Sequence, residues 1–201
     1  MRRKPNFFRS YFSFSGSPSF IKGRCPGSKA TVFNQTNSFA TAPIVSLNGR
    51  SFTISCWIKQ IKWVRDQFGA IYGDWHYPWQ FLLSTKNQRI AFQRHSTGSD
   101  EWPYLESNVL PLRNWTHVVV TWQHATGILV MYADGKVIGQ GSYSPPNERF
   151  YGPTGVQYKI GKDGHSQNHQ FYGSVMDLYV FGKALSLDEI NRLRGLRFMI
   201  L

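Results

Sequence analysis

The sequence contains only two cysteines, Cys25 and Cys56, in 201 residues. So few thiols exclude both the dense disulfide framework of small secreted domains and a zinc module with clustered cysteine ligands. The two thiols either form one bridge or remain free and buried. We favour free thiols, because two cysteines alone do not establish that they lie close together.

Long apolar runs are also missing from the chain. No stretch approaches the roughly 18 to 20 apolar residues that span a bilayer, so no membrane span is expected. The start MRRKPNFFRSYFSFSGS lacks the continuous apolar segment of a secretory signal. Its arginines resemble those of a mitochondrial presequence, but Pro5 and the lack of a clear amphipathic helix favour a fragment whose signal lies upstream.

Acidic residues are absent from the first third of the chain. Residues 1–65 carry eleven Lys or Arg and no Asp or Glu, and the formal net charge of the whole chain is +12. A basic end attracts any polyanion, so it identifies no single partner. The sequence has no RNP-type aromatic motif and no basic helix, which disfavours nucleic acid. A solvated charge excess is the simplest interpretation, and binding of a heparan-like polyanion is the alternative.

What the sequence does contain is a series of short runs rich in Val, Ile, Thr, Phe, Tyr and Trp between Gly, Pro, Asn and Asp clusters. This pattern predicts an all-β chain, and about ten short strands suit a two-sheet sandwich. The expected strands are residues 30–34, 51–59, 68–72, 79–85, 88–94, 116–123, 128–134, 136–140, 157–161 and 171–181.

Two local motifs fix the geometry further. Asp134-Gly135 predicts a type I′ turn, because both central residues of that turn need a positive φ. In strand 116–123, alternation places Val118, Val120 and Trp122 on one face, which we interpret as core.

A short C-terminal helix is predicted from a capping box. Ser186 can cap the helix, and Glu189 stands three residues later to complete the box. Leu185 and Ile190 can form the hydrophobic staple, and the helix should end near Arg194.

Several motifs occur in an order that is recognisable. They are SFTISCWIK (51–59), NWTHVVVTW (114–122), MYADGKVIG (131–139), YKIGKDG (158–164) and FYGSVMDLYVFGKALSLDEINRL (171–193). Over residues 28–194 the chain resembles the laminin-G-like, pentraxin-like group of the concanavalin A-type lectin/glucanase superfamily.

This resemblance implies an antiparallel two-sheet jelly-roll sandwich over residues 28–201, with one concave and one convex sheet. Residues 1–27 are then a basic N-terminal segment, either poorly ordered or the remnant of a first strand. The resemblance also implies that four aromatic residues are mostly core and that the protein is an extracellular or cell-surface module, often one that binds calcium. The four residues are Trp57, Trp115, Trp122 and Tyr179.

The chain departs from the pentraxin pattern in two respects. Val119 stands where pentraxins carry the second cysteine of a disulfide, so Cys56 lacks the pentraxin partner. The calcium-binding positions correspond to Asn87-Gln88 and Asp163-Gly164-His165, where only Asp163 supplies a carboxylate. Calcium prefers several hard oxygen ligands, so we expect at most a weak calcium site, formed by Asp163 and Asn87.

Catalysis is not expected. A retaining glycosidase needs two carboxyl groups about 5 Å apart, and the chain has no Glu-x-Asp-x-x-Glu pattern to supply them. The acids Asp188 and Glu189 are better explained as helix-stabilising residues. His165 and His169 share one loop, where we expect solvated side chains and no metal pair.

Two aromatic segments, DWHYPWQF (74–81) and DEWPYLE (100–106), are the predicted ligand surface. Flat rings in loops stack on sugar faces or anchor protein partners, although for each ring local packing is the more frequent explanation. The candidate residues are Trp75, Tyr77, Trp79, Trp102 and Tyr104, with Arg94 nearby. We therefore expect a non-enzymatic recognition or adhesion module that binds a glycan or an extracellular protein through its edge loops or concave sheet. The Asn34 and Asn114 triplets are glycosylation acceptors if the chain is secreted.

Overall fold

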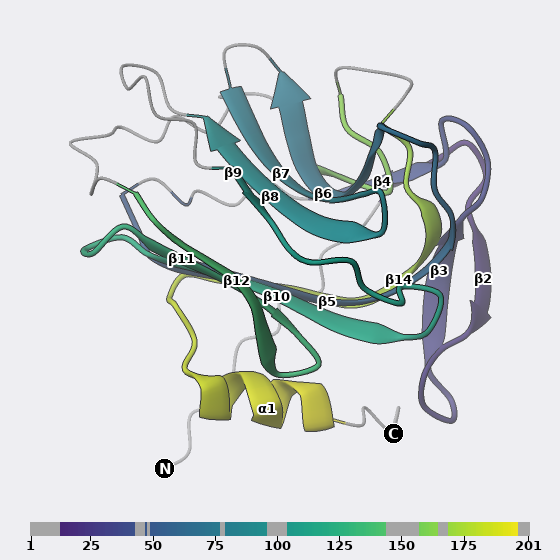
Figure 1. Cartoon of the computed structure of the whole chain (residues 1–201). Coiled ribbons are helices and arrows are strands. Elements are labelled where there is room, and N and C mark those ends of the chain that lie inside the picture. The colour runs from purple at the N-terminus through teal and green to yellow at the C-terminus, as the bar shows by residue number, and fades with distance from the viewer. Residues whose placement is uncertain are drawn as a thin grey trace.

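The computed structural model describes residues 13–42, 47, 49–76, 79–95, 104–143, 157–164 and 169–196. They form two antiparallel sheets packed face to face with one short helix, which confirms the predicted sandwich (Figure 1). The first sheet has the order β1 (Ser13–Ser15), β4 (Phe39–Thr41), β13 (Lys159–Ile160), β6 (Phe68–His76), β7 (Trp79–Lys86), β8 (Arg89–His95) and β9 (Tyr104–Glu106). The second has the order β12 (Lys136–Ser142), β11 (Ile128–Ala133), β10 (Thr116–Gln123), β5 (Phe52–Lys62), β14 (Tyr172–Phe181), β3 (Lys29–Phe33) and β2 (Ser19–Lys22).

All ten predicted strands are present, and the described residues form four further strands that were not predicted. The unpredicted strands β1, β2, β4 and β9 contain three or four residues each, too few to show alternation. Strand β6 also runs four residues past its predicted end, through Gly73 and Asp74 to His76. Gly73 and Asp74, which follow the predicted end of the strand, both lie inside the ladder with β7.

The main core lies between the sheets. Val118, Val120 and Trp122 all face into it, as the alternation in β10 predicted. Cys56 is also part of this core, and burial raises the pKa of its thiol to about 12. Cys25 is buried elsewhere, and neither cysteine forms a disulfide, so the prediction of free buried thiols is confirmed.

The hairpin between β11 and β12 has the predicted turn. Asp134 and Gly135 have φ angles of 50° and 78°, and Tyr132 pairs with Val137 beside them. A Cβ on Gly135 would lie 2.3 Å from the side-chain oxygen of Asn191, so a larger residue would displace that side chain where the hairpin approaches the helix.

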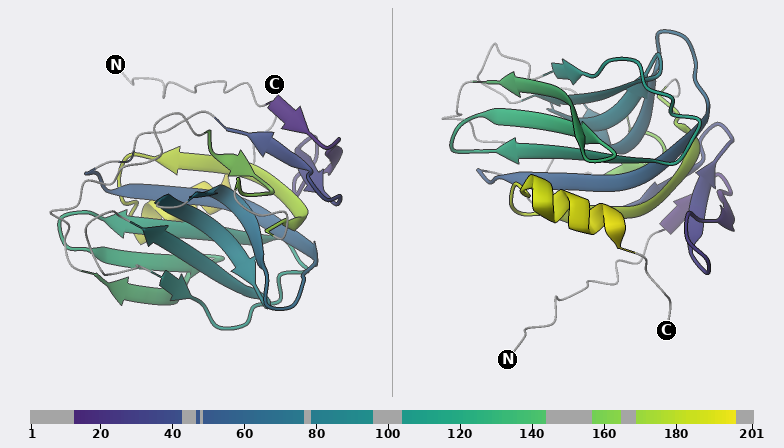
Figure 2. Two further views of the ribbon diagram at one scale, coloured as in Figure 1. Left: turned by 90° about the horizontal axis from the view of Figure 1, so that it is seen from above. Right: turned by 60° about the horizontal axis from the view of Figure 1, so that its bottom comes forward.

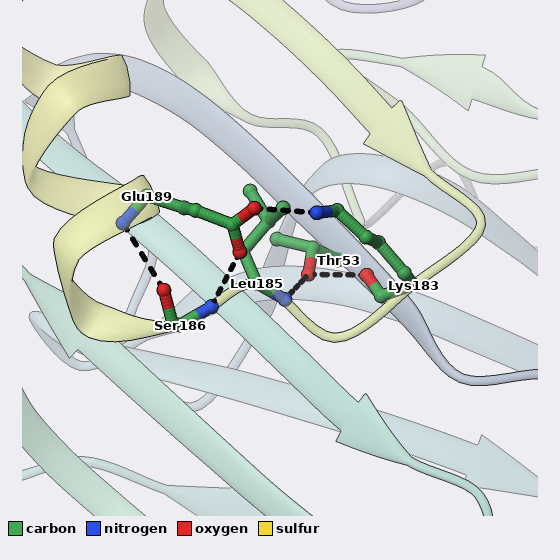
Figure 3. A network of polar contacts seen from close by, with 5 residues as sticks. All are labelled: Thr53, Lys183, Leu185, Ser186 and Glu189. Carbon is green, nitrogen blue, oxygen red and sulfur yellow. Dashed lines mark hydrogen bonds and ion pairs between the residues drawn. The ribbon is translucent and has the colours of Figure 1, made fainter.

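Helix α1 (Leu187–Gly195) covers the outer face of the second sheet (Figures 1 and 2). The predicted capping box is present: the Glu189 N–H donates to Ser186 Oγ at 3.3 Å, and the Ser186 N–H donates to Glu189 Oε2 at 2.9 Å (Figure 3). Leu185 and Ile190 are buried in one cluster with Val119 of β10, as the staple required. The Leu185 N–H also donates to Thr53 Oγ1 at 2.9 Å, which ties the helix start to β5.

On this covered face, His117 is nearly inaccessible, with 1% of its surface exposed. Its Nε2 lies 2.8 Å from Ser55 Oγ, and its ring packs 5.1 Å from that of Trp57. Trp57 and Trp115 belong to a second, smaller cluster with Ala30 and Met176, so of the four aromatic residues expected in the core only Trp122 lies in the main one. Tyr179 lines a cavity at the end of the sandwich.

Strands β1 and β2 add one outer strand to each sheet at one end of the molecule, where the N-terminal part of the chain is drawn in purple (Figure 2). Their exposed rings, Phe14 and Phe20, contact each other at 5.5 Å. The predicted boundary between residues 27 and 28 stays a prediction, and residues 1–12 lie outside the described part of the chain.

Candidate ligand-binding face

The outer face of the first sheet has a floor of small residues. Ala70 pairs with Ser84, and Ser84 pairs with Ala91, so the three form a row across β6, β7 and β8. The neighbours of Ser84 and Ala91 along the chain, such as Leu83 and Phe92, face the core, so the row faces outward. All three residues are nevertheless 0% exposed. Groups on the outer face must therefore lie over them.

Aromatic rings supply part of this cover. The ring of Phe68 on β6 contacts that of Tyr104 on β9 with centroids 6.4 Å apart. Strands β7 and β8 lie between β6 and β9 in the sheet, so this contact must pass across them. Phe68 also contacts Trp75 and His169, each at 5.6 Å. These four residues, Phe68, Trp75, Tyr104 and His169, are called the aromatic layer below.

His169 is positioned by a buried acid. Its Nδ1 contacts a carboxylate oxygen of Asp163, which is 0% exposed, and its ring packs on Trp75 at 4.8 Å with a tilt of 37°. Burial of the carboxylate keeps Asp163 away from any ligand, so its role is to hold the imidazole beside the indole. His169 is thus half-buried and packed, and the expectation that it is solvated is wrong. His165 lies outside the described residues.

Tyr104 is the most accessible ring of the aromatic layer, with 39% of its surface exposed. Its hydroxyl donates to Glu106, and its backbone carbonyl accepts a hydrogen bond from the Tyr143 hydroxyl at 3.1 Å. Burial raises the pKa of Tyr143, so this hydroxyl stays a proton donor at neutral pH. At the other side, the Lys86 ammonium lies 4.8 Å above the Phe68 ring. Rings, a carboxylate and an ammonium therefore share one surface.

The structure brings some of the predicted ligand residues together and separates others. Trp75 and Tyr104 both belong to the aromatic layer, linked through Phe68. Arg94 does not join them: it is 3% exposed, and its guanidinium lies 4.8 Å from the ring of the core residue Trp122. Trp79 pairs with His76 at the end of the β6–β7 ladder. Tyr77 and Trp102 lie outside the described residues.

The sequence did not identify Phe68 or His169 as site residues. Phe68 was assigned to a strand, and nothing in that pattern indicated which neighbours its ring would contact. His169 gains its place from a return of the chain after β13, where the Gly164 N–H donates to Asp74 Oδ1 at 2.7 Å. No local signal predicts that contact across 90 residues of sequence.

The two residues offered for a weak calcium ion have other partners. Asn87 Nδ2 donates to Asp66 Oδ1 at 2.9 Å, and Asn87 Oδ1 accepts from the Asp66 N–H at 3.0 Å, so Asn87 ties two loops together. Asp163 holds His169. Within the described residues, no group of three or more His, Cys, Asp or Glu side chains could hold a metal ion. These contacts do not fit a calcium site made by Asn87 and Asp163, and we assign calcium no role.

A serine and a histidine do meet in this structure, but not in a place suited to catalysis. The Ser55–His117 pair lies on the face that helix α1 covers, and both residues are at most 1% exposed. A substrate cannot reach a hydroxyl buried in this way, so the pair has a structural role.

Comparison with known proteins agrees with the fold. Residues 33–191, more than half of the chain, match the model of the concanavalin A-like lectin/glucanases superfamily of the laminin G type. The chain belongs to this family.

Three relatives illustrate the range of this similarity. The chain is 20% identical over 161 residues to the mouse pentraxin-related protein PTX3, a match that covers 76% of this chain and 41% of that protein. One similar solved structure is domain 4 of AbnA, an extracellular GH43 arabinanase from Geobacillus stearothermophilus, in complex with arabinotriose. Its TM-score is 0.70 and its sequence identity is 18%, and the match covers 94% of this chain and 89% of that one. The binding domain of Paraclostridial Mosquitocidal Protein 1 has a TM-score of 0.74 and 14% identity over 92% of this chain and 47% of that one. The chain thus spans less than half the length of PTX3.

Proposed function

We propose that this chain is a non-enzymatic recognition module that binds a glycan through the aromatic layer. The observation that carries the proposal is that Trp75 and Tyr104, remote in sequence, share one packed outer face with Phe68 between them. Such rings present flat apolar surfaces beside polar groups, which is the combination that sugar rings and their hydroxyls require. A protein ligand that anchors on the same rings is the competing outcome of the test.

The glycan is favoured over a protein ligand by the comparison with a solved relative. Domain 4 of the arabinanase AbnA carries arabinotriose on a sandwich of the same fold. Two members of the aromatic layer are also held by contacts that need no ligand: Asp163 contacts His169, and the Tyr143 hydroxyl donates to the backbone carbonyl of Tyr104. A surface ordered in advance loses little conformational entropy on binding.

An extracellular location is part of the proposal. The family supports it, because laminin-G-like and pentraxin-like domains are typical of extracellular proteins. Asn34 and Asn114, the two glycosylation acceptors, are both exposed, as modification would require. Separately, none of the helices in the described residues combines the length and apolarity needed to cross a membrane.

The test is a glycan array followed by calorimetric titration of the strongest hit, with arabino-oligosaccharides included in the panel. The variants Trp75→Ala and Tyr104→Ala should each weaken binding about three- to tenfold, the range expected for loss of one stacked ring. Phe20→Ala is the matched control, because Phe20 is an exposed ring, 56% accessible, on β2 of the other sheet. No signal on the array, or equal losses for Phe20→Ala and Trp75→Ala, would overturn the proposal.

A second candidate function, binding of a heparan-like polyanion, is favoured by one specific feature. Lys22 on β2 and Lys29 on β3 stand directly opposite each other, and both are exposed. Like charges opposite each other destabilise a strand pair, and a bound polyanion would relieve this repulsion. If this function is correct, Lys22→Gln and Lys29→Gln should elute from heparin at lower salt than the wild type, whereas Lys136→Gln, in the distant β11–β12 hairpin, should not. Equal elution of all four proteins would exclude it.

A further inference from the structure

A cavity of about 270 Å³ lies between the two sheets at the end of the sandwich where β3 leaves β14. Strand β3 pairs with β14 only from Gly173 to Val175, so the second half of β14 has no β3 partner and borders the cavity. The walls are mainly apolar and include Phe14, Phe33 and Ile160. A cavity of about 150 Å³ suffices for benzene, so this one has room for an aromatic ring and a short substituent.

The chain is irregular at the wall of this cavity. The register of β14 against β5 shifts between Met176 and Tyr179, which marks a β-bulge. Within the bulge Asp177 has a φ of 50°, a conformation that few residues other than Gly, Asn and Asp adopt. Bulges often re-aim a side chain, and here Asp177 is one of the residues that line the cavity.

The Asp177 carboxylate is half-buried without a counter-ion. Among the described residues, no hydrogen bond or ion pair engages it, and burial raises its pKa. Arg24, whose charge opposes this rise in pKa, has other partners: its guanidinium lies 4.0 Å from the Trp57 ring and donates to the Leu196 carbonyl at 3.1 Å. A partly buried carboxylate is stabilised in its charged form by a nearby cation, so the site favours a cationic ligand.

Two other groups at the cavity define what that cation can be. Burial raises the pKa of Tyr179 to about 12, so its hydroxyl is neutral and repels no ligand. Lys29 also lines the cavity and is exposed. The mainly apolar walls favour a ligand that carries an aromatic ring beside its charged group.

We propose that this cavity binds a small primary amine that carries one aromatic ring. The ammonium group would pair with Asp177, and the ring would lie between Phe14 and Phe33. The site is distinct from the aromatic layer, which lies on the outer face of the first sheet, so either proposal can fail without the other.

Calorimetric titration with phenethylamine tests the proposal, with 2-phenylethanol and ethylamine as comparators that lack the charge and the ring. Phenethylamine should bind at least tenfold more tightly than either, because a charged hydrogen bond and ring burial each contribute a factor of about ten. Asp177→Asn should lose at least tenfold in affinity. Asn tolerates the same φ, so this variant should melt like the wild type.

Asp188→Asn is the matched control, since it removes the same charge from an exposed position in α1 and should bind like the wild type. Lys29→Gln should bind phenethylamine more tightly, because it removes a positive charge from the lining of the cavity. The proposal is overturned if phenethylamine does not bind, if 2-phenylethanol binds equally well, if Asp177→Asn binds like the wild type, or if Lys29→Gln binds more weakly.

Discussion

Acid should destabilise this protein through His117. The imidazole is 1% exposed, and burial together with the nearby cations Arg194 and Arg24 lowers its pKa from 6.5 to about 4. The carboxylate of Asp134 accepts a hydrogen bond from the His117 backbone N–H at 3.0 Å, but burial, aided by the two arginines, still lowers the pKa of the imidazole. The folded protein thus keeps His117 neutral at pH values where the unfolded chain is protonated.

The sign and size of the effect follow from the two pKa values. The folded pKa lies below the unfolded one, so the stabilisation is complete above about pH 6.5 and is lost as the pH falls toward about 4. The whole shift corresponds to about 3 kcal/mol, of which about 2 kcal/mol should be lost by about pH 5. Below about pH 4 the folded form also protonates and the loss from His117 levels off.

Urea unfolding at several pH values between about 7 and 4.5 measures this effect. His117→Gln removes the titration but retains an amide that can reach Ser55, so its free energy of unfolding should fall by about 2 kcal/mol less than that of the wild type over this range. His124→Gln, at a half-exposed position, is the control and should fall as the wild type does. If His117→Gln and the wild type show the same pH dependence, the reasoning is refuted.

Three further predictions concern the fold. Ser186→Ala removes the helix cap and should lower the free energy of unfolding by about 1 kcal/mol in urea, whereas an unchanged value would show that the capping box has no energetic role. Gly135→Ala should lower the free energy of unfolding by about 1 to 2 kcal/mol, because Gly135 has a φ of 78° and a Cβ there would meet Asn191. Gly182→Ala should leave the free energy of unfolding nearly unchanged, because a Cβ there meets nothing within 4 Å. The Cys56 thiol should react with a thiol reagent at about pH 8 only after unfolding, since it is 0% exposed with a pKa near 12; rapid labelling of the folded protein would contradict its placement.

Local patterns were enough to predict most of the fold. The Asp134-Gly135 turn, the Ser186 capping box and the inward face of β10 each depend on residues close in sequence, and all three are confirmed. The predicted end of β6 was wrong for a physical reason. Position 73 of the strand requires a glycine, because its φ is 132° and a Cβ would lie 1.9 Å from the Phe81 carbonyl oxygen. Asp74 is buried in the strand, where its carboxylate accepts a hydrogen bond from the Gly164 N–H.

The site was less predictable, because contacts between distant segments create it. Trp75 and Tyr104 were predicted as ligand residues because aromatic residues among Pro, Gly and charged residues are candidates for a surface. The structure places both in the aromatic layer. Their link through Phe68 and the support from His169 depend on how β6, β9 and the segment after β13 meet in space. Arg94 was grouped with them because it is near in sequence, but its side chain lies against Trp122 on the core side of the sheet.

The most direct test of the account follows the indole N–H signals of the tryptophans by NMR while the best glycan from the array is added. Stacking on the aromatic layer predicts that the Trp75 signal shifts in proportion to saturation, while those of the buried Trp122 and of Trp57, on the far sheet, stay in place. A glycan that saturates the protein and leaves the Trp75 signal unmoved would contradict the account.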